Sequence, residues 1–237
     1  MSGSALDGRT RVDGVSPLDR AGELSLVAAI SGRLESMIIA GEIEAGGKLN
    51  EFALAQRLQV SRSALREAVR LLEQLGLVTI LPNRGVFVRR VSLKEALDLF
   101  DVRSGLAYTA GRLAAARGSD EQVSALRGLH EEMVVAWERR EIDRYYDLNL
   151  RFHADVMAMT GNDRLAALYA MMSNQLHLFR RRNLGNLAQL ELSLQEHARI
   201  LEGIETRDTA KTSRAFERHV MIGKQRMLDT LPMRHDA

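Results

Sequence analysis

Three histidines and an asparagine are the side chains best suited to chemistry in this 237-residue chain. Asn149 and His153 are four residues apart, so they project from one face if the segment is helical. His197 and His219 fall in two later helical segments, and in an antiparallel bundle such faces can converge. Three neutral imidazoles and an amide oxygen suit a divalent metal (Zn, Ni, Fe or Mn) that keeps positions open for water or a ligand. From spacing alone, however, helical histidines are more often surface residues or hydrogen-bonded core residues.

A row of basic side chains is a second candidate site. Arg62, Arg66 and Arg70 recur every four residues, so they share one face of a helix whose opposite face is apolar. The end of such a helix fits the DNA major groove, where arginine pairs bidentately with guanine. The hydroxyls of Ser61 and Ser63, with the free amides of the helix N-terminus, suit a phosphate. An arginine row alone is also typical of a solvated helix face, and its position between a helix-turn and a hairpin favours DNA.

The elements that carry this basic row are predicted from hydrophobic spacing and turn residues. Apolar residues at helical spacing predict a first helix over 18–41, and a short second helix follows over 51–58. Ser61 is a typical N-cap for a third helix that ends near Gly76. Two β-prone segments, 78–81 and 86–90, flank a turn sequence and predict a hairpin. Three helices followed by a hairpin form a winged helix-turn-helix.

The rest of the chain, from Ser92 onward, is predicted to be entirely helical. Ser92 with Glu95, and Ser119 with Gln122, form capping-box patterns that open the first two helices. The six predicted helices cover 92–117, 119–140, 142–159, 162–182, 186–205 and 208–230. Their short connections predict an antiparallel bundle. The predicted fold is therefore mainly α, with a winged helix-turn-helix over 18–90 and a six-helix antiparallel bundle over 91–237.

Composition narrows the class of protein further. There are no cysteines, which excludes disulfides and thiolate metal sites and fits a cytoplasmic protein. No apolar run of 18 residues is present, so no membrane span is expected. Residues 1–17 are polar at the start, lack the apolar stretch of a signal peptide, and are predicted to form a disordered arm. The net charge of +2 is too small to indicate nucleic acid by itself.

The N-terminal part of the chain resembles the DNA-binding domain of GntR-type transcription regulators. The resemblance covers about 70 residues and depends on linked motifs: Leu49-Asn50-Glu51, Val60-Ser61-Arg62, Arg66-Glu67-Ala68, Gly76-Leu77-Val78 and Arg84-Gly85. It implies that Ser61, Arg62, Ser63 and Arg66 contact operator DNA, with Arg70 as an addition. It also implies that the wing tip, Asn83, Arg84 and Gly85, enters the minor groove.

The C-terminal part resembles the ligand-binding FCD domain of the FadR branch of these regulators. The matching features are Asn149-x-x-Phe152-His153, Thr160-Gly161-Asn162, Glu196-His197 and Arg218-His219. The six-helix count resembles the VanR-like subgroup. In metal-binding members, an aspartate or asparagine and three histidines hold a divalent metal, which implies Asn149, His153, His197 and His219 as ligands here. Asparagine in place of aspartate removes one negative charge from this set.

The resemblance also implies what the helical domain senses. A cationic centre in an apolar bundle needs negative charge, which a small carboxylate effector supplies at the open coordination positions. Arg103 matches a family arginine and can clamp a second carboxylate, or it can form a salt bridge with Asp101 or Asp147. The predicted function is a ligand-responsive regulator, a repressor in the commoner case, that binds a palindromic double-stranded DNA operator as a homodimer.

Two other classes of function compete with this prediction. Three histidines with an open coordination position also suit a helical metalloenzyme, but no motif supplies a general base. An architectural DNA-binding protein without a ligand would need a broader basic patch than this sequence offers.

Overall fold

The computed structural model describes residues 17–180 and 187–229. Its buried apolar side chains form two separate cores, one in the N-terminal part and one in the helical part. Residues 1–16, which make up nearly all of the predicted arm, and the predicted break at Gly185-Asn186 lie outside the described residues. No helix in the described ranges is long and apolar enough to cross a bilayer.

The N-terminal part is a winged helix-turn-helix, as predicted. Its helices are α1 (Pro17–Ala40), α2 (Glu51–Leu58) and α3 (Arg62–Gln74). Its strands are β1 (Lys48–Leu49), β2 (Val78–Leu81) and β3 (Gly85–Val88), in the antiparallel order β1-β3-β2. The hairpin was predicted, whereas β1 was not, because a two-residue strand leaves no periodic pattern.

The turn between α2 and α3 sets where α3 begins. Gln59 adopts a left-handed backbone with φ of 54°, which ends α2. Ser61 then caps α3, its hydroxyl accepting a hydrogen bond from the Ala64 N–H at 3.1 Å. The apolar face of α3 packs into the core through Leu65, Val69 and other buried residues, so the opposite, basic face is exposed.

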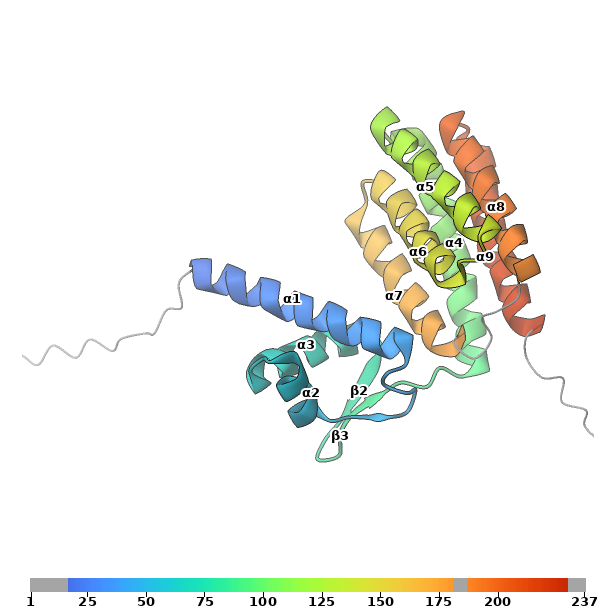
Figure 1. Ribbon diagram of the computed structural model, residues 1–237. Coiled ribbons are helices and arrows are strands. Elements are labelled where there is room, and N and C mark those ends of the chain that lie inside the picture. The colour runs from blue at the N-terminus through green and yellow to red at the C-terminus, as the bar shows by residue number, and fades with distance from the viewer. Residues whose placement is uncertain (1–16, 181–186, 230–237) are drawn as a thin grey trace, which may run out of the picture.

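Six antiparallel helices form the second part, also as predicted (Figure 1). They are α4 (Leu93–Arg117), α5 (Asp120–Glu138), α6 (Ile142–Met159), α7 (Asp163–Arg180), α8 (Leu187–Glu205) and α9 (Thr209–Asp229). Ser119 and Gln122 form the predicted reciprocal capping box at the start of α5. Ser92 caps α4 by accepting from the Glu95 N–H at 3.2 Å.

A stripe of small residues on α4 packs within the chain. Ala107, Ala110 and Ala114 are fully buried, and α4 makes its most extensive contact with α9. A Cβ added at Gly111 would lie 2.7 Å from the Thr212 carbonyl oxygen of α9. The two backbones approach this closely because glycine has no side chain, so packing inside the bundle accounts for the stripe.

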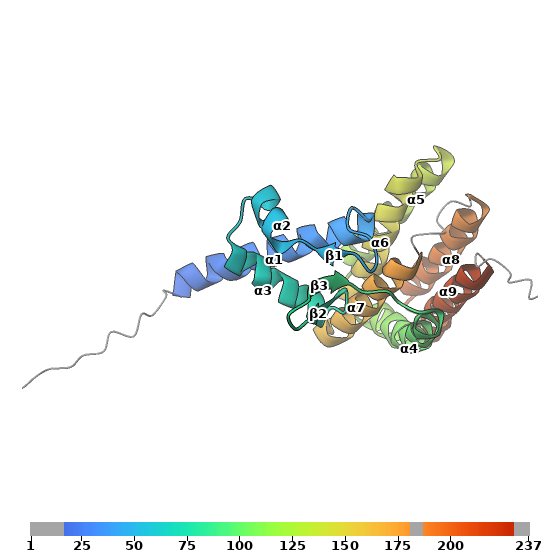
Figure 2. The ribbon, with the colours of Figure 1, turned by 90° about the horizontal axis from the view of Figure 1, so that it is seen from below.

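Helix α7 joins the two parts (Figures 1 and 2). The Asn174 amide of α7 donates to the Glu35 carboxylate of α1. The neighbouring Gln175 donates to the Leu75 carbonyl at the C-terminal end of α3, at 3.1 Å. Leu178 packs against the N-terminal core. One face of α7 therefore lies in the bundle, and another holds the helices of the winged domain.

Candidate functional site

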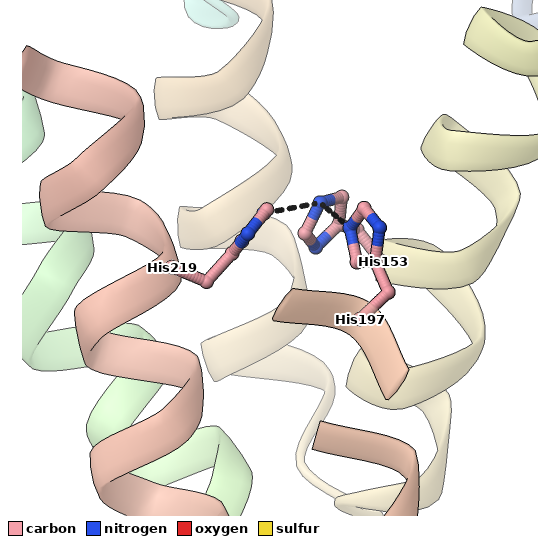
Figure 3. A group of neighbouring side chains, drawn as sticks. All are labelled: His153, His197 and His219. Carbon is pink, nitrogen blue, oxygen red and sulfur yellow. Dashed lines mark hydrogen bonds between the residues drawn. The ribbon is translucent and has the colours of Figure 1, made fainter. Parts of the chain in front are cut away.

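Three histidines from three helices converge in the middle of the bundle (Figure 3). His153 lies on α6, His197 on α8 and His219 on α9. The Nε2 atom of His153 lies 3.2 Å from Nε2 of His219 and 3.4 Å from Nε2 of His197. All three rings are buried. The structure thus brings together three of the four predicted metal ligands.

The spacing of the three nitrogens fits a single metal ion. Ligand nitrogens at about 2.0–2.1 Å from one ion, at ordinary coordination angles, lie roughly 3.0–3.4 Å from one another. The two measured contacts fall in this range, and one ligand nitrogen from each ring lies within 4.8 Å of the other two. The pKa of His197 is well below its usual value because the ring is fully buried and lies beside His219. Burial therefore favours the neutral imidazole that a metal requires.

Buried partners orient two of the rings. His219 Nδ1 lies 2.7 Å from the Glu196 carboxylate, which also accepts from Arg226 at 2.5 Å. Burial raises the pKa of Glu196, and the Arg226 cation opposes this shift. A carboxylate at Nδ1 holds the proton there and leaves the Nε2 lone pair free to face the centre. On the other side of the cluster, the Tyr169 hydroxyl lies 3.5 Å from His153 Nδ1.

The fourth predicted ligand, Asn149, lies one helical turn before His153 and is half-buried. It lines a cavity of about 970 Å³ that also reaches His153 and His219. No hydrogen bond joins its amide to the three rings among the described contacts. Asn149 therefore lies near the cluster because it lines the same cavity as two of the rings, and not through a direct hydrogen bond within the described residues.

Arg103 is buried in the wall of the same cavity. Its Nη2 donates to the Tyr169 hydroxyl at 2.7 Å, and its guanidinium lies 4.5 Å from the centre of that ring. In the described part of the chain it forms no ion pair with Asp101 or Asp147, and Asp101 instead accepts from Lys224 at 2.5 Å. The Nε atom of Arg103 has no hydrogen-bond partner among residues 17–180 and 187–229. The sequence left two roles for Arg103, a clamp on a ligand carboxylate or a salt bridge to Asp101 or Asp147. The described residues do not form that salt bridge.

The basic face of α3 is exposed, as the sequence predicted. Arg62, Ser63, Arg66 and Arg70 all point to solvent. Arg66 lies 3.8 Å from Glu51 and Arg70 lies 2.9 Å from Glu67, both as exposed ion pairs. Exposed pairs of this kind contribute little to stability, so an anionic ligand can replace the carboxylates easily.

The wing tip is an exposed turn. Asn83 and Gly85 have positive φ angles of 58° and 103°, and Arg84 between them is exposed. The sequence did not predict Lys48, which β1 brings against β3 opposite Phe87. A Cβ added at Gly85 would lie 2.9 Å from the Lys48 side chain. Lys48 thus adds a cation beside the wing.

The sequence also missed the residues that orient the cluster, Glu196 and Tyr169. Glu196 directly precedes His197, but it supports the histidine of another helix, so sequence adjacency gives no sign of its role. Tyr146 and His177, whose hydroxyl and Nδ1 are hydrogen-bonded, line the cavity further along α6 and α7.

Comparison with known proteins identifies the family. Residues 26–88 match the family described as bacterial regulatory proteins, gntR family, and residues 98–221 match the FCD domain. The chain belongs to the GntR family. It is 30% identical over 193 residues to the uncharacterized HTH-type transcriptional regulator YdhC of Bacillus subtilis, a match that covers 80% of this chain and 83% of that protein. It is also 27% identical to the repressor GlaR of Escherichia coli, over 79% and 89% of the two chains.

Two solved structures have the same fold as this chain. E. coli McbR/YncC superposes with a TM-score of 0.74 at 18% identity, covering 86% of this chain and 97% of that one. A GntR regulator from Rhodococcus gives a TM-score of 0.71 at 20% identity, covering 88% and 100%. The matched family model and the matched relatives describe transcription regulators, so this GntR-family protein is a DNA-binding regulator and the metalloenzyme alternative is wrong.

Proposed function

We propose that this GntR-family protein is a metal-dependent repressor of the VanR-like subgroup that releases its operator when a small carboxylate binds. The observation that carries the proposal is the convergence of three buried imidazoles, with Nε2 separations of 3.2 and 3.4 Å, of which His153 and His219 line a large cavity. The six FCD helices support the subgroup. The names of two E. coli relatives, the repressors GlaR and RspR, support repression.

The winged domain, residues 18–90, would bind the operator. We assign the DNA contacts to the exposed face of α3 and to the wing, through Ser61, Arg62, Ser63, Arg66, Arg70, Asn83, Arg84 and Gly85. The hydroxyl of Ser61 caps α3, so its contact to phosphate would be shared with that role. A homodimer in the cytoplasm would present two such faces to a palindrome, since a two-fold protein matches a two-fold site.

The helical domain, residues 91–237, would hold the metal through Asn149, His153, His197 and His219. When bound, a divalent ion supplies a positive charge that attracts a carboxylate to its open positions. Arg103 is suited to bind the same acid, because its side chain is buried in the cavity wall and its Nε atom has no hydrogen-bond partner among the residues that the structure describes. A carboxylate oxygen would supply that partner. A bound ion and Arg103 would thus present two cationic groups to one acid.

Helix α7 offers the route from the cavity to DNA. His177 lines the cavity, and two residues earlier Gln175 holds the carbonyl end of α3. A ligand that shifts α7 by a fraction of a turn would change the orientation of α3 relative to the bundle. Coupling arises only if the ligand has different affinities for the two arrangements.

The test is operator binding by the full-length protein. Genomic fragments captured by the protein would supply the operator, and fluorescence anisotropy would then measure its affinity with a panel of carboxylic acids, with Zn²⁺ or with a chelator. We expect at least one acid to weaken binding about tenfold or more, a coupling of roughly 1.4 kcal/mol, and the chelator to abolish this effect. Gln175→Ala should reduce the acid's effect while leaving bound metal unchanged. No specific capture of DNA, or no effect of any acid, would overturn the proposal.

A further inference from the structure

The cavity beside the histidines reaches the DNA-binding domain. Glu35, Ser36 and Ile39 of α1 line the same 970 Å³ space as His153 and His219 of the bundle. A molecule that fills this space therefore touches both domains. This wall of the cavity plays no part in the metal site.

The charged groups that line the cavity are unevenly distributed. Two cations line it: Arg103 lies at the histidine end, where the Tyr169 hydroxyl contacts both Arg103 and His153, and Arg226 is ion-paired with the buried Glu196 carboxylate. Carboxylates lie towards the other end: Asp147 and Asp143 precede His153 on α6 by six and ten residues, or about 9 and 15 Å along the helix axis. The third carboxylate, Glu35 of α1, accepts a hydrogen bond from Asn174 of α7. Asn174 follows Tyr169 by five residues, which is about 7.5 Å along the axis of α7.

The Glu35 carboxylate has few hydrogen-bond or ion-pair partners for a half-buried group. It is half-buried, and it accepts one hydrogen bond from the Asn174 amide. No cation lies within ion-pair distance of it in the described ranges. Burial raises the pKa of Glu35, which means that its charged form has lost solvation that the protein does not replace. A hydrogen-bond donor or a cation on a ligand would replace the solvation that the charged Glu35 carboxylate has lost.

We infer that Glu35 binds the far end of the effector, and that the effector is an elongated acid whose distal group donates hydrogen bonds, such as an ω-amino or ω-hydroxy acid. This inference rests on the proposed function, which places the carboxylate at the histidine end. The three carboxylates disfavour a second carboxylate at the distal position. Because Glu35 belongs to α1, the same contact ties the effector to the DNA-binding domain.

The test uses the full-length, Zn²⁺-loaded protein and four acids of equal chain length: hexanoate, 6-aminohexanoate, 6-hydroxyhexanoate and adipate. Isothermal titration calorimetry would measure each affinity, and shorter and longer homologues would define the preferred length. We expect 6-aminohexanoate or 6-hydroxyhexanoate to bind at least tenfold more tightly than adipate. Glu35→Gln should remove most of this preference and leave the affinity for hexanoate unchanged, since glutamine still accepts from Asn174.

Two further variants control the measurement. Glu35→Lys should reverse the order in favour of adipate, and Glu44→Gln, an exposed carboxylate of the same domain outside the cavity, should change nothing. Equal binding of hexanoate and its distal derivatives, or a preference for adipate in the wild type, would overturn this inference alone. If no homologue of any length binds although Zn²⁺ does, both this inference and the acid effector are wrong.

Discussion

The two candidate sites are built in opposite ways. The basic face lies on successive turns of one helix, α3, and its arginines are exposed. The histidine cluster takes one ring from each of α6, α8 and α9, and every ring is buried. On one exposed helix face, replacing one side chain leaves the positions of the others unchanged. A site between three packed helices depends on each ring and on the side chains that orient it.

The largest effect is expected inside the bundle. His197→Ala removes a proposed ligand that is fully buried, so metal affinity should fall more than about 100-fold, beyond the loss typical of an orienting residue. Elemental analysis of the purified protein and a Zn²⁺ titration would measure this, with circular dichroism to verify folding. His130→Ala is the matched control, because its ring contacts the Leu194 carbonyl outside the cluster. Equal metal in both variants would contradict the assignment.

On the exposed face, a single substitution should cost less. Arg66→Ala should weaken operator binding by roughly 1–3 kcal/mol, the value of one bidentate base contact. The Glu51 pair that Arg66 loses is exposed, so the stability of the protein should hardly change. Anisotropy at fixed salt would measure the affinity, with Arg112→Ala, an exposed arginine of the bundle, as control. An unchanged affinity would remove Arg66 from the interface.

A residue beside the cluster sharpens the contrast, because Glu196 is not one of the proposed metal ligands. Glu196→Gln should lower metal affinity by about 10- to 100-fold, since an amide holds the His219 Nδ1 proton less firmly than a carboxylate. Competition with a chromophoric chelator would measure the change. Glu202→Gln, an exposed residue of α8 paired with Lys211, should leave the affinity as it is. Identical affinities would mean that packing alone orients His219.

The smallest effect concerns Glu35, at the boundary of the two domains. Its pKa is raised in the folded state, so the folded protein holds this proton more tightly than the unfolded chain does. The wild type therefore loses stability as the pH rises from about 4.5 through the folded-state pKa. Glu35→Gln lacks this loss, so its free energy of unfolding relative to the wild type should increase between pH 4 and pH 7 in urea unfolding. A constant difference would mean that Glu35 is fully solvated.

The sequence predicted one site better than the other because the two kinds of pattern differ. Arg62, Arg66 and Arg70 follow the period of the helix that carries them, so their shared face is a local property. The clustering of the three histidines was suggested by their helical positions and by family resemblance, but their separations depend on how α6, α8 and α9 pack. Glu196 illustrates the limit, since its neighbour in sequence is His197 and its partner in space is His219.

By itself, the sequence determined the helices, their caps, the hairpin and the exposed basic face, because hydrophobic period and capping residues act over a few positions. Only the tertiary structure decided that β1 brings Lys48 to the wing, that Arg103 bonds Tyr169 instead of an acid, and that Glu35 of one domain lines the cavity of the other. These contacts join residues far apart in the chain. They follow from the packing of whole helices, which no local pattern encodes.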